Sequence, residues 1–278
     1  MAEILDGKKL KEKVLGELKQ KIDSMDSKPT LVVILVGENP ASKIYVNNKK
    51  KTAEQLGINS QVINYPANIS EQELLLKIEE LNNDNSISAI LVQLPLPDHI
   101  SKENVINAIA PKKDVDGFTP SNFGKLFSGE VPTVYPCTPK GILLLLDEYN
   151  IELKGKHVVI VGRSNIVGRP LSQMLLNRNA TVTVCHSYTE NLEQITKTAD
   201  ILVSAVGKNI IEGKMLKTGC VVVDVGIFKD ENGKTRGDID FESVSQIASY
   251  VSPVPGGVGP MTITSLMLNT VELFENQR

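Results

Sequence analysis

Tyr45 and Lys49 stand four positions apart near the amino terminus, and both could take part in acid–base chemistry. On a helix this spacing places the two side chains on one face. A lysine in a dry cleft loses part of its affinity for protons and can act as an acid or base, while a tyrosine ring can stack on a flat substrate. The spacing alone is a weak signal, because Lys49 also starts a run of three lysines typical of a solvated helix face.

Three further polar residues lie in two segments, one at the end of an apolar run and one after a helical segment. Gln93 ends the strand-like stretch ISAILVQL, and a stiff QLPLP turn follows it. Asp114 and Asp116 lie in the segment KDVDG, where a carboxylate could hold an amino-pyrimidinone edge through two hydrogen bonds. Each has an ordinary structural explanation, since Asp before Gly117 is common in turns and Gln93 could cap backbone groups. Taken singly, these residues favour the structural explanation.

The segment VVIVGRSNIVGRP lies where the phosphate-binding loop of a dinucleotide fold would lie, directly after the first strand of the second half. Gly162 allows a tight turn, and Gly168 allows the next helix to approach the strand. Backbone N–H groups at the start of that helix would face a pyrophosphate. The spacing is GxxxxxG rather than GxGxxG, so it is weak as a general motif and more particular when read as GRSxxVGxP.

The end of the following strand distinguishes NADP from NAD. NAD-binding enzymes often carry an acidic residue there for the ribose hydroxyl, but TVTVC is followed by HSYT, which contains no acid. Arg163 and Ser187 offer a guanidinium and a hydroxyl, which suit a 2′-phosphate better. We therefore expect NADP, although either residue taken alone could equally be an exposed surface or turn residue.

Alternating helices and strands must position these groups. Apolar residues recur every four positions from Leu10 to Ile22, which predicts a helix with one buried face. The apolar run Leu31–Val36 predicts a strand covered on both sides, and Pro40 and Gly57 bracket a second helix. Ser70 and Glu73 have capping-box spacing. Further strands are expected at 58–65, 87–94, 157–162, 181–185, 200–206, 220–226 and near 250.

This winding predicts an α/β protein with two domains. We expect an N-terminal α/β catalytic domain from residues 1–138 and a Rossmann-like parallel-sheet domain from residues 139–260. Residues 111–136 are rich in Gly, Pro, Asp and Ser and read as a long ordered loop, and a helix is expected over 139–149. The helix expected at 261–278 would pack back on the first domain.

Composition excludes several classes of protein. The net charge of −3 argues against nucleic-acid binding. The three cysteines and three histidines are scattered, which indicates neither a metal site nor a disulfide framework. The first residues carry no apolar signal region, and no apolar run approaches the roughly 20 residues that cross a bilayer. We therefore expect a cytoplasmic protein with no membrane or nucleic-acid partner.

Taken together, the segments resemble the bifunctional methylenetetrahydrofolate dehydrogenase/methenyltetrahydrofolate cyclohydrolase (FolD-type) family. The match runs through ASKIYVNNKKKTAEQLGI, LVQLPLP, PKKDVDGF, PCTPKG, VVIVGRSNIVGRP, VVVDVGI and SPVPGGVGPMT, in an order that covers nearly the whole chain. KDVDG and PVPGGVGPMT are the most particular segments. The resemblance implies oxidation of 5,10-methylenetetrahydrofolate with NADP, hydrolysis of the product to 10-formyltetrahydrofolate, a site between two α/β domains, and, by analogy, a homodimer formed through the dinucleotide domain.

The resemblance also implies roles for individual residues. Lys49 is the catalytic lysine and the proton carrier of the hydrolytic step, Tyr45 stacks on the folate, Gln93 tunes the lysine, and Asp116 binds the pterin edge. The residues implied around NADP are Gly162, Arg163, Ser164, Ser187 and Ile227. Those implied beside the folate are Pro255, Gly256 and Gly257.

Three other interpretations remain open at this point. The chain could be a different two-domain NADP oxidoreductase resembling shikimate or amino-acid dehydrogenases, which would not be expected to carry both KDVDG and PVPGGVGPMT. It could be a binding or regulatory protein on a dehydrogenase fold, although Lys49, Gly162 and Gly168 are all present. It could also be a dehydrogenase without hydrolytic activity, which Lys49 and Gln93 argue against.

Overall fold

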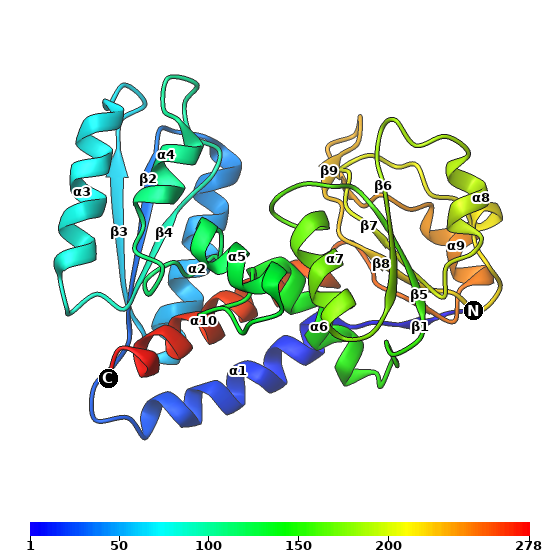
Figure 1. The fold of residues 1–278 in the computed structure, drawn as a ribbon, viewed down its shortest axis with the longest axis horizontal. Helices are drawn as coiled ribbons and strands as arrows, with labels where there is room; N and C mark the ends of the chain where they lie inside the picture. The colour runs from blue at the N-terminus through cyan, green and yellow to red at the C-terminus, as the bar shows by residue number, and fades with distance from the viewer. The chain divides into compact units, whose positions relative to one another are not determined.

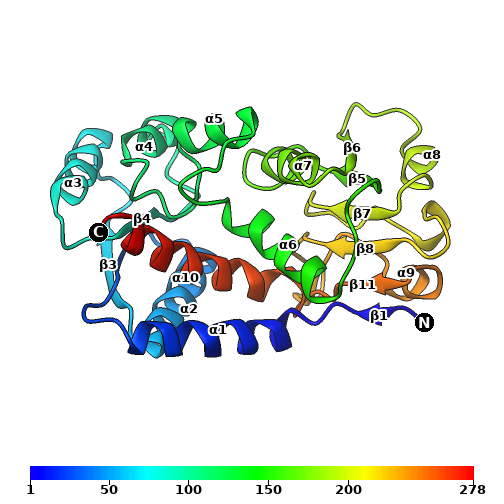
Figure 2. The same ribbon diagram turned by 60° about the horizontal axis from the view of Figure 1, so that its bottom comes forward.

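A computed structural model describes all residues, 1–278, and divides the chain into two compact units. The six-stranded unit comprises Met1–Lys13 and Thr138–Thr264, and the three-stranded unit comprises Val14–Cys137 and Ser265–Arg278. We expected residues 1–138 to lie together. The structure instead groups Met1–Lys13 with the second half, because strand β1 (Glu3–Ile4) pairs with β11 (Tyr250–Val251). Figure 2 shows this pairing at the edge of the larger sheet.

The three-stranded unit is built on a parallel sheet in the order β3-β2-β4. Strand β2 (Thr30–Val36) lies between β3 (Asn59–Tyr65) and β4 (Ala89–Val92), and it is buried almost throughout. Its even-numbered residues, Val32, Ile34 and Val36, belong to a core cluster with residues of α3 and α4. Figure 1 shows α3 and α4 with this sheet. An apolar side chain on each face explains why β2 reads as a continuous apolar run.

Helices α2 and α3 of this unit begin where the sequence predicts. Helix α2 (Pro40–Leu56) has Pro40 in its first turn and ends at Gly57, whose φ of +82° is left-handed. Helix α3 (Glu71–Asn83) carries both hydrogen bonds of the Ser70 and Glu73 capping box. The remaining helices are α1 (Gly7–Asp23), which begins in the other unit, α4 (Lys102–Ala108) and α5 (Pro120–Ser128).

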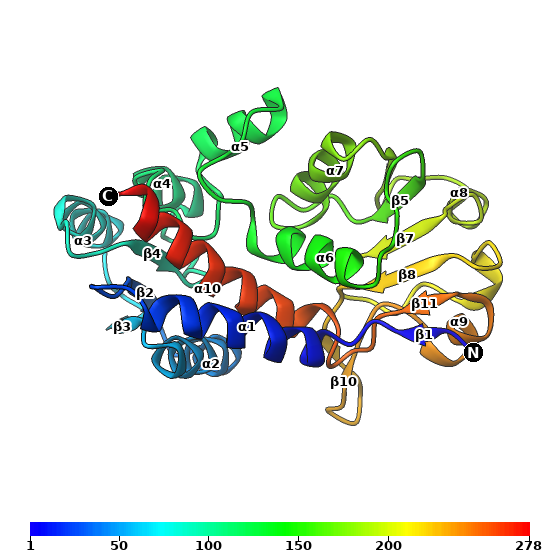
Figure 3. The ribbon, with the colours of Figure 1, turned by 90° about the horizontal axis from the view of Figure 1, so that it is seen from below.

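One helix of this unit was not expected from the sequence, and another was. Helix α5 interrupts the segment expected to be a loop, where Pro120 occupies the first turn and Gly129, with φ +81°, ends the helix. The C-terminal helix α10 (Val258–Asn276) enters this unit from Ser265 onward. There Glu275 pairs with Lys21 of α1 at 2.7 Å, and α10 lies beside α1 in Figure 3. The expected return of the last helix is confirmed.

The six-stranded unit contains an entirely parallel sheet in the order β1-β11-β8-β7-β5-β6. Its remaining strands are β5 (His157–Val161), β6 (Thr181–Cys185), β7 (Ile201–Ser204) and β8 (Val221–Asp224). A separate antiparallel hairpin joins β9 (Phe228–Lys229) and β10 (Thr235–Arg236). The sequence did not predict the hairpin or β1, because two-residue strands carry no periodic pattern.

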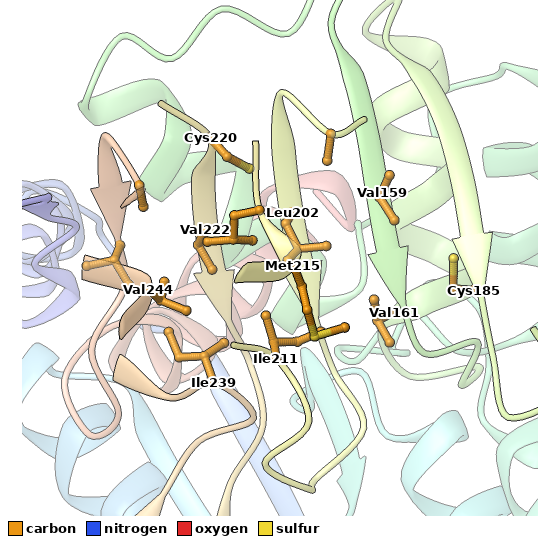
Figure 4. Packing of buried hydrophobic residues seen from close by; sticks show 14 residues of the cluster. Val159, Val161, Cys185, Leu202, Ile211, Met215, Cys220, Val222, Ile239 and Val244 are labelled. Carbon is orange, nitrogen blue, oxygen red and sulfur yellow. The ribbon is translucent and has the colours of Figure 1, made fainter. Parts of the chain in front are cut away.

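One face of this sheet packs on a large apolar cluster. Figure 4 shows Val159 and Val161 of β5, Leu202 of β7 and Val222 of β8 within it. Val244 of helix α9 (Phe241–Ile247) covers the same face, close to the short helices α8 (Leu192–Thr196) and η1 (Gly213–Met215). Helix α7 (Gly168–Asn177) packs against β5 and β6 and contributes no residue to this cluster. Helix α6 (Cys137–Glu148) begins at the border of the two units.

No helix is both long enough and apolar enough to pass through a membrane. Cys137, Cys185 and Cys220 are buried and form no disulfide. Burial raises the pKa of Cys220 to about 12, so this thiol stays protonated and packs as a small apolar side chain.

Candidate active site and dinucleotide site

Lys49 and Gln93 meet at the carboxyl edge of the three-stranded sheet. The Lys49 ammonium donates to Gln93 Oε1 at 3.0 Å. Gln93 Nε2 in turn donates to the carbonyl of Leu94 at 2.7 Å, and this bond orients the amide so that its oxygen faces the lysine. Lys49 and Lys50 are half-buried and Lys51 is exposed, and it is Lys49 whose ammonium is bonded to Gln93. The structure therefore separates Lys49 from a simple solvated basic run.

Asp116 lies within electrostatic reach of the same lysine. Its segment runs beside β4, with Asp114 bridged to Ile90 and the N–H of Ile90 donating to the carbonyl of Lys113 at 2.8 Å. Burial raises the pKa of Asp116, while the positive charge of Lys49 and a hydrogen bond with the Cys137 thiol act in the opposite direction. A lysine, an amide and a carboxyl group therefore gather at one place, a combination suited to moving protons.

The other two polar residues of KDVDG have structural roles. Asp114 is buried and accepts from the N–H groups of Gly117 and Thr119 and from Asn122 Nδ2, at 3.0, 2.7 and 2.9 Å. Lys113 is only 1% exposed, and its ammonium donates to the carbonyls of Leu81 and Asp84 near the end of α3. Asp116 is therefore the acidic residue of this segment that remains available for a ligand.

Tyr45 lies one turn before Lys49 on α2, and its side chain is 42% exposed. The buried positions of this helix include Ser42, Val46 and Ala53, so the ring is not part of the core. An exposed aromatic ring beside a lysine can lie against a planar ligand. Strands β3 and β4 flank β2 on opposite sides, which makes the carboxyl ends of β2 and β4 a topological switch point, where α/β sheets bind ligands.

The six-stranded unit has its own switch point, between β5 and β7. Gly162 leaves β5 with φ +119°, and a Cβ at this position would lie 2.5 Å from the carbonyl oxygen of Ala205. A Cβ on Gly168 would overlap the carbonyl oxygen of Gly162. Both glycines are thus required for the close packing of this turn, and no side chain caps the amino end of α7. Such a cradle fits a pyrophosphate.

Arg163 and Ser187 lie on neighbouring loops at this edge. The Arg163 guanidinium lies 6.0 Å from the ring centre of Tyr188, directly after Ser187. Ser187 and Arg163 are both exposed. Ser164 also shapes the turn, since its Oγ accepts from the N–H of Val167 at 3.1 Å and its carbonyl accepts from the N–H of Arg169 at 3.0 Å.

The other predicted ligand-binding residues of this unit follow β8 and β11. Ile227 lies just after β8 and is 49% exposed, and the segment Pro255–Gly257 follows β11. All strands of this sheet are parallel, so these positions share the carboxyl edge with Gly162. The structure therefore gathers Tyr45, Lys49, Gln93 and Asp116 in one unit and the remaining predicted residues in the other.

Two buried acids in the six-stranded unit were not singled out from the sequence. Asp224 at the end of β8 and Asp238 after the hairpin are 2% and 0% exposed. Burial raises the pKa of Asp224 to about 7, and the nearby charge of Asp238 adds to this, against backbone N–H donors that lower it. An acid directly after a buried apolar strand is the signal that could have identified Asp224.

Because the pKa of Asp224 is raised on folding, we expect the stability of the protein to depend on pH. Its pKa is near 3.8 when exposed and about 7 when folded, so the folded state binds the extra proton between these values. Stability should therefore fall as the pH rises from about 4 to about 7, by up to about 1.4 kcal/mol for each pH unit. Urea unfolding at several pH values measures this slope, and Asp224→Asn should flatten it. An identical slope in the variant would mean that Asp224 is not the group responsible.

No group of three or more His, Cys, Asp or Glu side chains is arranged to hold a metal ion. The three-stranded unit presents a lysine, an amide and a carboxyl group, and the six-stranded unit presents a glycine turn that could hold a phosphate. A parallel sheet with a glycine turn at its switch point, joined to a second α/β unit carrying a lysine, is typical of two-domain nucleotide-dependent dehydrogenases.

Comparison with known proteins identifies the family within this class to which the chain belongs. Residues 5–116 match the model "Tetrahydrofolate dehydrogenase/cyclohydrolase, catalytic domain", and residues 136–278 match the "NAD(P)-binding domain" of the same family. The chain belongs to the tetrahydrofolate dehydrogenase/cyclohydrolase family. It thus contains an NAD(P)-binding domain and a catalytic domain whose matched range includes Lys49, Gln93 and Asp116.

Individual relatives match over the full length. A bifunctional protein FolD from Hydrogenobaculum sp. is 53% identical over 276 residues, covering 99% of both chains. The crystal structure of a bifunctional FolD from Campylobacter jejuni is 50% identical, with TM-score 0.98 and 100% of both chains covered. A Trypanosoma brucei FolD, complexed with NADP and an inhibitor, is 35% identical, with TM-score 0.94 over 99% of this chain and 98% of that one.

The shikimate dehydrogenases share the fold alone. The enzyme from Aquifex aeolicus is 16% identical, with TM-score 0.54, over 91% of this chain and 94% of that one. This shared fold explains why the architecture alone was compatible with a shikimate-type dehydrogenase. Membership of the tetrahydrofolate dehydrogenase/cyclohydrolase family decides against that interpretation.

Proposed function

We propose that this chain carries out two successive reactions on one-carbon tetrahydrofolate derivatives, with the cofactor-binding turn supplied by the six-stranded unit and the catalytic lysine by the three-stranded unit. It oxidises 5,10-methylenetetrahydrofolate to 5,10-methenyltetrahydrofolate and then hydrolyses that product to 10-formyltetrahydrofolate. The observation that carries the proposal is the cluster of Lys49, Gln93 and Asp116 at a sheet edge. Its test is a spectrophotometric assay of the two half-reactions with purified protein. Failure of either half-reaction would refute the bifunctional assignment.

The oxidation depends on alignment more than on a protein acid. NADP, when bound, accepts the hydride that leaves the methylene carbon, while positive charge spreads over the two flanking nitrogens. Gly162 and Gly168 would let the backbone approach the pyrophosphate, and Ile227 would contact the cofactor. The close packing of this turn, which leaves no room for a Cβ at either glycine, supports this role, as does the NADP held by the Trypanosoma brucei relative.

The hydrolysis needs proton transfer by the protein. Water adds to the methenyl carbon and loses two protons, one to the ring nitrogen that is released and one to solvent. Lys49 carries a proton between these atoms, and Gln93 orients its ammonium through the 3.0 Å bond. Tyr45 stacks on the folate, Asp116 binds the pterin edge, and Pro255, Gly256 and Gly257 contribute substrate-binding backbone.

Arg163 and Ser187 would bind the 2′-phosphate and favour NADP over NAD. Arg163→Ala should therefore raise the KM for NADP about tenfold or more, the size expected for a lost charge-assisted bond, and change the KM for NAD less than about twofold. Steady-state oxidation with each cofactor measures this. Arg178→Ala, which removes an arginine paired with Asp147 at the far end of α7, is the control. Equal changes for the two cofactors would refute the phosphate role.

The proposal extends to the oligomeric state of the protein and its location in the cell. We propose a homodimer formed through the six-stranded unit, in line with the family resemblance, and a cytoplasmic location, in line with three buried cysteines that form no disulfide. Sedimentation velocity tests the first: a monomer at micromolar concentration would contradict it. Purine synthesis and other one-carbon pathways would consume the 10-formyl product.

A further inference from the structure

The buried carboxylate of Asp238 binds the loop that follows β7. Its Oδ2 accepts from Ser204 Oγ at 2.9 Å and from the N–H of Val206 at 2.7 Å, and its Oδ1 accepts from the N–H of Lys208 at 2.9 Å. The side chain is 0% exposed. A buried carboxylate is costly unless hydrogen bonds satisfy it. The three bonds from Ser204, Val206 and Lys208 therefore hold the carboxylate and the chain that follows β7 in place.

The loop held in this way forms a wall of the phosphate-binding turn. Ala205 lies between the bonded residues Ser204 and Val206, and its N–H donates to the carbonyl of Val161 at 2.8 Å. Its carbonyl oxygen occupies the space that a Cβ on Gly162 would need. The position of Ala205 therefore sets how the chain turns at Gly162.

The same carboxylate also lies under the turn that follows β8. A Cβ on Gly226 would overlap Asp238 Oδ1, and Gly226 directly precedes Ile227. The backbone of Asp238 is itself held, since its N–H donates to Asp224 Oδ1 at 2.8 Å. Asp238 thus contacts both the loop that packs against Gly162 and the turn that leads to Ile227, without itself being exposed to a ligand.

We propose that Asp238 is a positioning residue of the dinucleotide site, which sets NADP affinity by holding the Ala205–Lys208 loop against Gly162. This inference rests on the proposed function, in that the Gly162 turn binds the cofactor. The Asp238→Asn variant keeps the size of the side chain but places an NH₂ group where one oxygen accepts an N–H. Such a change breaks at least one of the three bonds.

The test compares Asp238→Asn with Asp230→Asn. Asp230 is a matched control, because it also accepts two backbone N–H groups, from Asn232 and Lys234, but does so inside the hairpin. Titration calorimetry with NADP should show a Kd raised about tenfold or more in Asp238→Asn and less than about twofold in the control. Hydrogen exchange at 205–209 should be faster in Asp238→Asn only, and hydrolysis of methenyl substrate should stay within about twofold of the unmodified protein.

Three outcomes would overturn the inference. An unchanged Kd in Asp238→Asn would show that the loop does not set affinity, and equal losses of hydrolysis and NADP binding would show a general folding role. If Asp238→Asn does not fold, Ser204→Ala removes one donor to the same carboxylate, and an unchanged Kd in that variant would also overturn it. Failure of the unmodified protein to bind NADP would instead refute the proposed cofactor site, so the two failures are distinguishable.

Discussion

Replacing Lys49 with alanine should abolish hydrolysis of 5,10-methenyltetrahydrofolate, lowering kcat by about a thousandfold or more. The physical reason is that the ammonium held 3.0 Å from Gln93 Oε1 is the group placed to shuttle protons beside Asp116. Folding should survive, because Lys49 is half-buried and not part of the apolar core. Loss of methenyl absorbance, followed beside circular dichroism of the variant, measures both.

Lys50→Ala provides the matched control for this prediction. Lys50 lies on the same helix and pairs with Glu54 at 3.7 Å, with 45% of its side chain exposed. A surface pair of this kind contributes little to stability, so this variant should hydrolyse substrate at nearly the normal rate. Normal hydrolysis by a folded Lys49→Ala variant would refute the catalytic assignment, and equal losses in both variants would mean that only the overall charge of the helix matters.

Replacing Gly168 with alanine should weaken NADP binding, and with it the dehydrogenase reaction, while sparing hydrolysis. A Cβ at the start of α7 would overlap the carbonyl oxygen of Gly162, so either the turn or the helix must move. Overpacking of this kind costs about 1–3 kcal/mol, which corresponds to a roughly fivefold to 150-fold loss of NADP affinity if the shift falls on the turn. Calorimetric titration with NADP, at a temperature well below the unfolding midpoint, measures the loss.

Gly16→Ala is the corresponding change at a position with space. Gly16 lies inside α1, and a Cβ there would have no neighbour within 4 Å. Alanine should even stabilise this helix by about 1 kcal/mol, with both activities unchanged. If Gly168→Ala bound NADP normally, the tight turn at Gly162 would not be part of the cofactor site.

The sequence predicted the elements that carry strong local signals. Pro40 and Gly57 bracket α2, and the Ser70 capping box opens α3, because these residues set backbone conformation by themselves. The continuous apolar runs became the central strands of two parallel sheets. Helix α5 was missed because Gly, Pro and Ser dominate its segment, although Pro120 and Gly129 are the residues that begin and end it.

The roles of individual site residues were harder to predict from the sequence, because they depend on contacts between distant segments. Spacing could not distinguish Asp114 from Asp116, and it is the bonds from Gly117, Thr119 and Asn122 that commit Asp114 to the backbone. Asp238 showed no signal, since its three donors lie about 30 residues earlier in the chain. The pairing of Lys49 with Gln93 was expected only through the family resemblance, and the structure supplies the bond.

The central claim is that one chain performs both steps, with Lys49 needed for the second. The most direct measurement supplies 5,10-methylenetetrahydrofolate and NADP together and follows NADPH, the methenyl intermediate and the 10-formyl product over time. We predict that the unmodified protein forms 10-formyltetrahydrofolate in step with NADPH, whereas any NADPH formed by Lys49→Ala is matched by accumulating methenyl intermediate. Formation of the 10-formyl product by Lys49→Ala at the normal rate would contradict this account.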